Sequence, residues 1–351
     1  MFNHLLHIED KQVGRHCPVY IVAEIGINHN GDMDLARRTI DAARQAGVDA
    51  VKFQNYQTED FLSDRSLTYR YVSNGKVVEE SQYDMFKRCE LSGDDLTMLA
   101  AYCRQVGISF HSTPTSPAGV RQLVQLGAPV LKNGSDYLVH LELIEEMGRT
   151  GLPVVLSTGM ATLTEIEDAI AAFRRTGNEQ LIVLHCTSRY PTLPVEVNLS
   201  RMNTLSQTFG TLVGFSDHSE GVTAAAIAAA LGACWIEKHF TLSRELPGPD
   251  HMMSADPAEL ELLVTTIRAA EVMPGDPAIV PTHVEESSRL NFRLSCVAAR
   301  DLAPGTIISR EDIVFRRPGS GLPPKMADFL VGMELKKMVS RGQMLDKGSL
   351  Q

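Results

Sequence analysis

Short apolar segments alternate with amphipathic ones along most of the chain. The apolar segments are rich in Val and Ile and run continuously, a pattern typical of parallel strands that are buried on both faces. Helical patterns separate them, and several of these end at a glycine, where helices commonly stop. Eight apolar segments are present, at residues 19–27, 48–54, 108–114, 129–135, 153–159, 181–186, 212–218 and 235–240.

This regular alternation predicts the fold of the first domain. Eight strand-plus-helix units indicate a closed (β/α)8 barrel, a TIM barrel of the α/β class, over residues 1–273. An open, doubly wound sheet is the alternative. It is disfavoured because the units follow one another without a pause and no G-x-G-x-x-G motif follows the first strand.

The pattern changes after the last unit. Residues 274–289 contain three prolines and little periodicity, which predicts a linker. Residues 290–351 then carry short β-like runs separated by turns that contain Gly and Pro. We expect a small, β-rich C-terminal module there, which is small for independent stability and is expected to dock on another surface.

The composition of the chain argues against several classes of function. The chain has 351 residues and a formal net charge of −10, which argues against nucleic-acid binding as its main role. Its N-terminus does not resemble a signal peptide, and no segment reaches the roughly 18 apolar residues of a membrane span. Six scattered cysteines without a C-x-x-C pair are typical of reduced thiols, so we expect a cytoplasmic protein.

Polar residues gather at the predicted carboxyl ends of the strands, where barrels of this kind carry their active sites. Buried polar groups are unfavourable unless they are paired, so their presence at nearly every strand end predicts one shared polar pocket. The strand ends carry Glu24, Asn28, His29, Lys52, Gln54, Ser112, Thr113, Lys132, Ser135, Ser157, Thr158, His185, Ser188, Tyr190, Ser216, Asp217, His218, Glu237, Lys238 and His239.

Two histidines indicate a metal site. A lone histidine at such a position is more often a hydrogen-bonded core residue, but His218 and His239 end adjacent predicted strands and can share one ion. Oxygen ligands from substrate and water would complete an open coordination sphere. This composition suits open coordination of Mn²⁺ or Mg²⁺, with Co²⁺ as a further alternative, better than a closed zinc site.

Two lysines indicate an anion site. Lys52 and Lys132, together with nearby serine hydroxyls, provide the cations and donors that a phosphate or carboxylate requires. A lysine that forms a Schiff base with a carbonyl substrate is a rival interpretation, and the residues themselves leave it open.

These strand ends resemble those of the sialic acid synthase family. The stretches AEIGINHNGD, VKFQ, STPTS, LSTGM, HCTSRYPT, GFSDHSEG, EKHFT and PGPDH follow one another in the order and spacing of that family. The C-terminal module resembles the antifreeze-like (SAF) domain that ends those enzymes, with FRRPGSG as its clearest mark. The resemblance covers nearly the whole chain and is least distinctive over residues 64–92.

The resemblance implies roles for individual residues. His218 and His239 match the Mn²⁺ ligands of the family. The catalytic and sugar-binding part of the site is matched by Glu24, Gln54 and Asp250. Arg317, in the SAF module, matches an arginine that reaches the neighbouring subunit's site, which implies a domain-swapped homodimer. The phosphoenolpyruvate-binding positions are matched by Lys52, Thr113, Lys132, Ser135, Ser157, Ser188, Tyr190 and Ser216.

Two positions depart from the family pattern. Many members carry Asn where this chain has Ser188, and many carry an acidic residue where it has Tyr137, next to Asp136. There are two alternatives. Either Asp136 takes the place of that acidic residue through a small shift of the chain, or the sugar pocket of this protein differs from that of the other members. The departures bear on which sugar is bound rather than on the class of reaction.

The implied activity condenses phosphoenolpyruvate with an N-acylated amino sugar to give a nine-carbon α-keto acid and phosphate. N-acetylmannosamine, which gives N-acetylneuraminate, is the default substrate. A 2,4-diacetamido-6-deoxyhexose, as for legionaminic or pseudaminic acid, is the alternative. A 6-phosphorylated sugar is disfavoured because the sequence shows no additional basic cluster. Two rival classes are a Schiff-base aldolase and a non-catalytic SAF-type binding protein.

Overall fold

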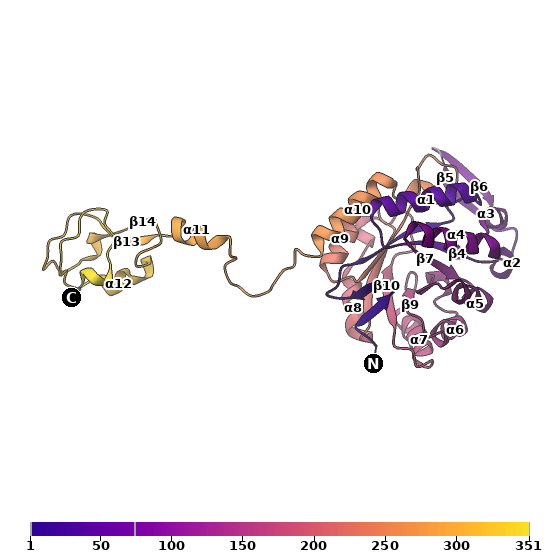
Figure 1. Cartoon of the computed structure of the whole chain (residues 1–351), viewed down its shortest axis with the longest axis horizontal. Helices are drawn as coiled ribbons and strands as arrows, with labels where there is room; N and C mark the ends of the chain where they lie inside the picture. Colours follow the sequence, from indigo (N-terminus) through magenta and orange to yellow (C-terminus); the bar gives the residue numbers. More distant parts are fainter. Residues whose placement is uncertain (1, 74, 351) are drawn as a thin grey trace. The chain divides into compact units, whose positions relative to one another are not determined.

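The computed structural model describes residues 2–73 and 75–350 and divides into two compact units (Figure 1). The first unit is Met1–Gly275 and the second is Asp276–Gln351. Each unit has its own hydrophobic core, so each is described by itself.

Eight parallel strands form the centre of the first unit, and they are almost entirely buried, as continuous apolar runs predict. They are hydrogen-bonded in the order β7, β4, β3, β12, β11, β10, β9 and β8, and β7 lies beside β8, so that the barrel is nearly closed. The predicted barrel is therefore confirmed. The strands are β3 (Tyr20–Gly26), β4 (Ala50–Asn55), β7 (Ser109–Pro114), β8 (Leu131–Asn133), β9 (Val154–Ser157), β10 (Leu181–Cys186), β11 (Leu212–Asp217) and β12 (Trp235–His239).

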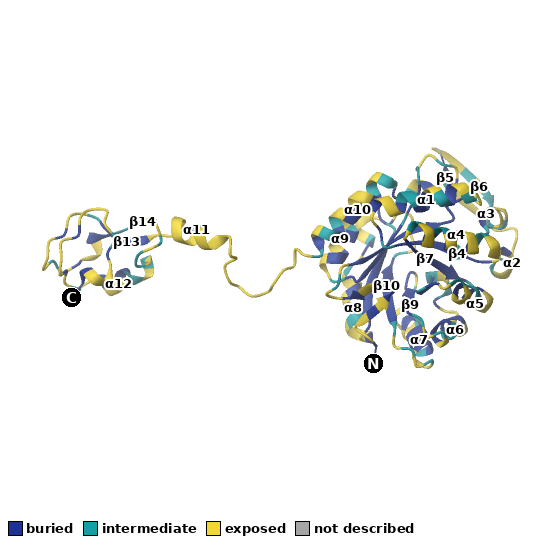
Figure 2. Ribbon diagram, viewed as in Figure 1, coloured by how far each residue is buried: buried dark blue, intermediate teal, exposed yellow. Residues whose placement is uncertain are grey.

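Helices surround the barrel and bury one face each against it (Figure 2). Local sequence fixes where they begin and end. The Asp32 side chain accepts hydrogen bonds from the first backbone N–H groups of α1, and Gly47 ends that helix with φ 84°, in the left-handed region that favours glycine. The helices are α1 (Met33–Ala46), α4 (Gly93–Val106), α5 (Pro117–Leu126), α6 (Leu141–Arg149), α7 (Leu163–Arg174), α8 (Ser200–Phe209), α9 (Thr223–Ala230) and α10 (Pro257–Ala270).

An N-terminal β-hairpin packs against the barrel and shares a buried hydrophobic cluster with residues of the barrel strands. It consists of β1 (Leu5–Ile8) and β2 (Lys11–Gly14). Its buried Leu6, Ile8 and Val13 join a cluster that contains the sole tryptophan, Trp235. The periodicity of the sequence does not predict this hairpin, because strands of four residues are too short to show alternation.

A long excursion separates β4 from α4. It contains α2 (Thr58–Phe61), β5 (Thr68–Ser73), β6 (Lys76–Ser81) and α3 (Gln82–Cys89). A small cluster of edge-to-face aromatic rings, formed by Tyr56, Phe61 and Phe86, anchors it. This excursion coincides with the stretch in which the sequence resemblance is least distinctive.

The second unit is small and rich in β-structure, as predicted. Its strands β13 (Ser295–Ala298) and β14 (Ile313–Arg316) pair antiparallel, and α11 (Glu285–Phe292) and α12 (Ala327–Leu330) accompany them. Its own core includes Leu302, Leu335 and Val339. α11 begins inside the segment that the sequence predicts to be a linker.

None of the described helices is long and apolar enough to cross a membrane. All six cysteines are free thiols.

We predict that the hairpin stabilises the barrel. Leu6→Ala should lower the free energy of unfolding of the first unit by about 2–5 kcal/mol, because it leaves a cavity beneath the strands. Leu5→Ala, a neighbouring position that is 45% exposed, should change it by less than about 0.5 kcal/mol. Urea unfolding followed by Trp235 fluorescence reports on this unit alone, and equal midpoints for the two variants would contradict the prediction.

Candidate active site

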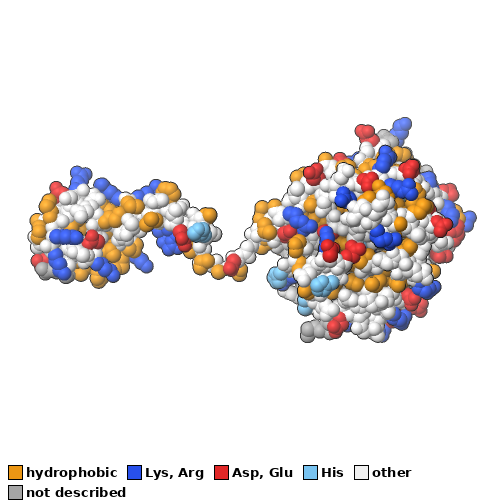
Figure 3. Space-filling model, in the orientation of Figure 1, with side chains coloured by type: hydrophobic (Ala, Val, Ile, Leu, Met, Phe, Trp, Pro, Cys, Tyr) orange, Lys and Arg blue, Asp and Glu red, His pale blue; other side chains and the backbone are white. Residues whose placement is uncertain are grey.

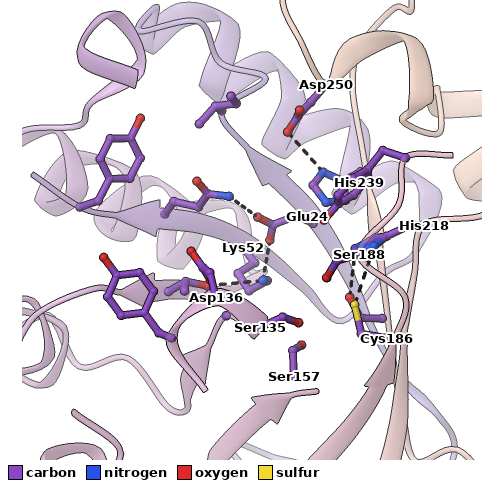
Figure 4. Close-up of a pocket in the computed structure, with 18 of the residues that line it drawn as sticks. Glu24, Lys52, Ser135, Asp136, Ser157, Cys186, Ser188, His218, His239 and Asp250 are labelled. Atoms are coloured by element: carbon purple, nitrogen blue, oxygen red, sulfur yellow. Dashed lines mark hydrogen bonds and ion pairs between the residues drawn. The ribbon is translucent and has the colours of Figure 1, made fainter. Parts of the chain in front are cut away.

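A cavity of about 420 Å³ opens at the carboxyl ends of the barrel strands (Figure 4). Of the fourteen site residues predicted from the sequence, thirteen line it. The fourteenth, Arg317, belongs to the second unit, where its guanidinium lies 5.1 Å from the ring centre of Phe292. The thirteen are Glu24, Lys52, Gln54, Thr113, Lys132, Ser135, Ser157, Ser188, Tyr190, Ser216, His218, His239 and Asp250.

Four buried charged side chains form the floor of this cavity. Lys52 Nζ lies 2.9 Å from Glu24 Oε2 and 3.4 Å from Glu237 Oε1. Lys132 Nζ lies 3.5 Å from the same oxygen of Glu237 and donates hydrogen bonds to Ser157 Oγ at 2.6 Å and to the Asn133 carbonyl. The cations and carboxylates therefore share one network, in which each charge has an opposite partner.

The two carboxyl groups of this network ionise differently. Burial raises the pKa of Glu24 to about 7, because the charge of Lys52 offsets desolvation only in part and Glu237 adds repulsion. Burial also disfavours the charged form of Glu237, but Lys132 and Lys52 outweigh it and lower its pKa to about 2. A proton shared by the pair therefore resides on Glu24, which suits a group that transfers protons near neutral pH.

Hydroxyl groups converge on the cavity beside Lys132. Ser135 Oγ accepts a hydrogen bond from the backbone N–H of Gly159 at 2.9 Å. A Cβ atom on Gly159 would lie 2.3 Å from Ser188 Oγ and 2.8 Å from Ser135 Oγ, so only glycine lets these hydroxyls approach the backbone. Ser157 and Ser216 complete a set of donors that suits an oxyanion.

The two predicted metal ligands lie beside each other. The ring centres of His218 and His239 are 5.4 Å apart, and the Tyr190 ring lies 4.1 Å from His218. His218 Nδ1 is 2.8 Å from the Thr187 carbonyl, which can only accept a hydrogen bond, so Nδ1 carries the proton and Nε2 is the acceptor nitrogen, 3.4 Å from Ser216 Oγ.

His239 is also suited to bind a cation. Its buried Nδ1 has no hydrogen-bond partner among residues 2–73 and 75–350 and lies 3.7 Å from Asp250 Oδ2. Burial, followed by the nearby His218, holds the pKa of His239 well below its usual value, which keeps the ring in the neutral form that binds metals. The described residues contain no group of three or more His, Cys, Asp or Glu side chains placed to hold an ion. Two imidazoles alone would therefore need further ligands from water or substrate to complete a coordination shell.

The remaining wall is apolar and aromatic. It comes mainly from the excursion between β4 and α4, which contributes Tyr56, Tyr69, Met85 and Phe86 to the cavity lining. Tyr137 and Ser188, the two positions that depart from the family pattern, both line the cavity, and so does Asp136. Among the described lining residues, Lys52 and Lys132 are the sole Lys or Arg side chains.

Sequence reasoning assigned no role to Glu237 or Cys186, although both line the cavity. The sequence predicts Glu237 only as one of the polar strand ends, and it lies two residues before His239, on the same side of β12. Lys238, between them, points away and pairs with the buried Asp217 at 2.9 Å. No sequence signal marked Cys186. Seven other residues of the predicted polar set do not line this cavity: Asn28, His29, Ser112, Thr158, His185, Asp217 and Lys238.

Comparison with known proteins assigns the family. The NeuB family model matches residues 39–278 and the SAF domain model matches residues 295–351. The chain is 39% identical to an uncharacterised protein of Methanocaldococcus jannaschii over 94% of each chain, and 37% identical to the N,N'-diacetyllegionaminic acid synthase of Legionella pneumophila over 95% of each chain. The sialic acid synthetase structure from Leptospira borgpetersenii covers 82% of this chain and 95% of its own, with a TM-score of 0.74 at 32% identity.

The resemblance seen in the sequence is thereby confirmed: the chain belongs to the NeuB family and ends in a SAF domain, which makes it a phosphoenolpyruvate-dependent nonulosonic acid synthase.

Proposed function

We propose that the protein joins phosphoenolpyruvate to a 2,4-diacetamido-6-deoxyhexose, giving a nine-carbon α-keto acid and phosphate. The proposal rests on a single cavity whose two ends differ in their chemistry. Two lysines and a set of hydroxyls form an anion-binding end, and aromatic and apolar side chains form the other wall. Two imidazoles lie on the cavity wall as well.

The lysine end would bind phosphoenolpyruvate. Lys52 and Lys132 supply positive charge, while Thr113, Ser135 and Ser157 supply hydroxyl donors. The methylene carbon of phosphoenolpyruvate then forms a bond with the aldehyde carbon of the open-chain sugar. Water adds to the phosphate-bearing carbon, and the bond between that carbon and the phosphate oxygen breaks, which leaves the keto group and releases phosphate.

His218 and His239 would hold a divalent ion, for which we propose Mn²⁺. When bound, the ion supplies Lewis-acid polarisation of the aldehyde oxygen. Asp250, whose Oδ2 lies 3.7 Å from His239 Nδ1, would add negative charge beside the ion. Glu24 would take the proton of the attacking water, because its carboxyl group lines the cavity. There it contacts Lys52 and lies beside Gln54.

The lining supports a deoxy, diacetamido sugar over N-acetylmannosamine. Met85, Phe86 and Tyr69 present apolar surface that suits a methyl group and a second acetamido group. The similarity to the Legionella pneumophila enzyme points the same way. A 6-phosphorylated sugar would meet no additional Lys or Arg among the described lining residues. The free cysteines support the cytoplasm as the compartment that we propose.

A panel of sugars tests the proposed substrate. The purified chain, with Mn²⁺ and phosphoenolpyruvate, should release phosphate fastest with a 2,4-diacetamido-6-deoxyhexose, more slowly with N-acetylmannosamine and least with its 6-phosphate. The measurement is kcat/KM from released phosphate. A preference for N-acetylmannosamine would correct the sugar, and the absence of turnover with every sugar would revive the SAF-type binding protein.

Metal dependence is the second expected property. EDTA should abolish turnover and Mn²⁺ should restore it, because each imidazole has a nitrogen that can coordinate the ion. The His218→Ala/His239→Ala chain should regain no activity with Mn²⁺ and should bind the ion more weakly, as measured by calorimetry. Full activity of that double variant in chelator would refute the metal site.

The two cavity lysines should bind anions rather than form an imine. Lys52→Met and Lys132→Met should each weaken phosphoenolpyruvate binding by about 1.5–3 kcal/mol, roughly 10- to 100-fold in Kd. Lys238→Met is the matched control, because Lys238 is equally buried but pairs with Asp217 outside the cavity. A substrate-dependent mass adduct on Lys52 or Lys132 after borohydride treatment would favour the Schiff-base aldolase instead.

We further propose that Arg317 completes the sugar site of a neighbouring subunit in a domain-swapped homodimer. Its side chain is exposed on the second unit, beside Pro318 and Gly319. That unit carries 11 Lys and Arg against 9 Asp and Glu, whereas the first carries 22 against 34, so the two have opposite net charge (Figure 3). Opposite charge favours association between them.

Complementation tests this arrangement. Arg317→Ala should raise the sugar KM or lower kcat while metal binding is retained. A His218→Ala chain mixed with an Arg317→Ala chain should recover activity above either parent, because one site of each mixed dimer has both residues intact. If verified mixed dimers recover nothing, the arginine does not act across subunits.

A further inference from the structure

A second cavity, of about 570 Å³, lies between α7 and α8. It adjoins the active-site cavity, because Met160, Cys186 and Ser188 line both. Figure 4 shows Cys186 and Ser188 at one side of the active-site pocket, near His218. Ser188 belongs to the hydroxyl set that surrounds Gly159, so the second cavity starts at the anion-binding end of the site.

One unpaired cation lines this second cavity. Arg201, in the first turn of α8, is exposed and makes no side-chain hydrogen bond or ion pair within the described part of the chain. No Asp or Glu is among the described lining residues, and Ser188 and Thr204 contribute hydroxyl groups. The hydroxyls of Thr158 and Thr187 donate to backbone carbonyls instead, and much of the remaining lining is apolar. An unpaired guanidinium with two hydroxyls and no carboxylate is a composition that suits a phosphate ion.

Met160 lines both cavities and has an unusual backbone conformation. Its φ is 65°, in the left-handed region that residues with a side chain rarely adopt, and it is 72% exposed. Such a conformation costs of order 1 kcal/mol and is characteristic of functional sites. The side chain is unbranched and flexible, so it can move aside without a change in the barrel.

We infer that the cavity between α7 and α8 is an exit site for inorganic phosphate, with Arg201 as its anion-binding residue and Met160 at its inner end. This inference rests on the proposed function, in which phosphate is released at the lysine end of the site. The sugar-derived product then lies between the phosphate and the aromatic side of the cavity. A second cation beside the hydroxyls gives the phosphate a route that does not require the product to leave first.

The kinetic test uses the full-length protein with Mn²⁺, phosphoenolpyruvate and its best sugar. Arg201→Gln should form keto acid at the wild-type rate in a single turnover but release phosphate roughly tenfold more slowly, measured with a fluorescent phosphate-binding sensor. Arg201→Lys should restore most of the release rate. Arg121→Gln, which removes an exposed arginine from α5, is the matched control and should change neither step. An unchanged release rate in Arg201→Gln overturns the inference.

An equilibrium test separates this inference from the proposed function. Inorganic phosphate titrated into the full-length protein by calorimetry should occupy two sites, and Arg201→Gln should lose one of them while the other keeps its affinity. This experiment needs no turnover, so it gives an answer even if every sugar is inactive. A single phosphate site that Arg201→Gln leaves unchanged would overturn the inference whether or not the enzyme activity is confirmed.

Discussion

Two buried lysines and two buried carboxylates must stay paired beneath the pocket, and the rest of the site depends on this pairing. The four groups come from four different strands: Glu24 from β3, Lys52 from β4, Lys132 from β8 and Glu237 from β12. Loss of one partner would leave a buried charge uncompensated, at about 3–5 kcal/mol. When Glu24 holds a proton, the network has one more cation than anions, which prepares it for an anionic substrate without a separate basic patch.

The negative net charge of the protein does not oppose this chemistry. The acidic side chains are spread over the first unit, whereas the two cavity lysines act at short range in a buried, weakly screened environment. Local burial and pairing therefore decide what binds, and the overall charge chiefly affects solubility and association. The imidazole pair is also set by its immediate surroundings, because the Thr187 carbonyl fixes the proton of His218 on Nδ1 and burial keeps His239 neutral.

Strand alternation sorts neighbouring residues into separate tasks. On β12, Glu237 and His239 face the cavity, while Lys238 between them pairs outside it with Asp217. A shift of one residue in the register would exchange these roles, so the hydrophobic pattern that sets the register also sets the chemistry. The excursion between β4 and α4 is not bound by this constraint, and it supplies the apolar wall of the cavity.

The sequence by itself determined the eight-stranded barrel, the β-rich second module and the family, because continuous apolar runs and closely spaced motifs are local signals. It also predicted thirteen residues that the structure brings into one cavity, because parallel strands place their carboxyl ends together. Only the tertiary structure showed the N-terminal hairpin, the charge network that includes Glu237, the aromatic wall and the cavity that contains Arg201. These depend on which side chains from distant segments meet and how deeply they are buried, and no pattern along a single chain segment contains that information.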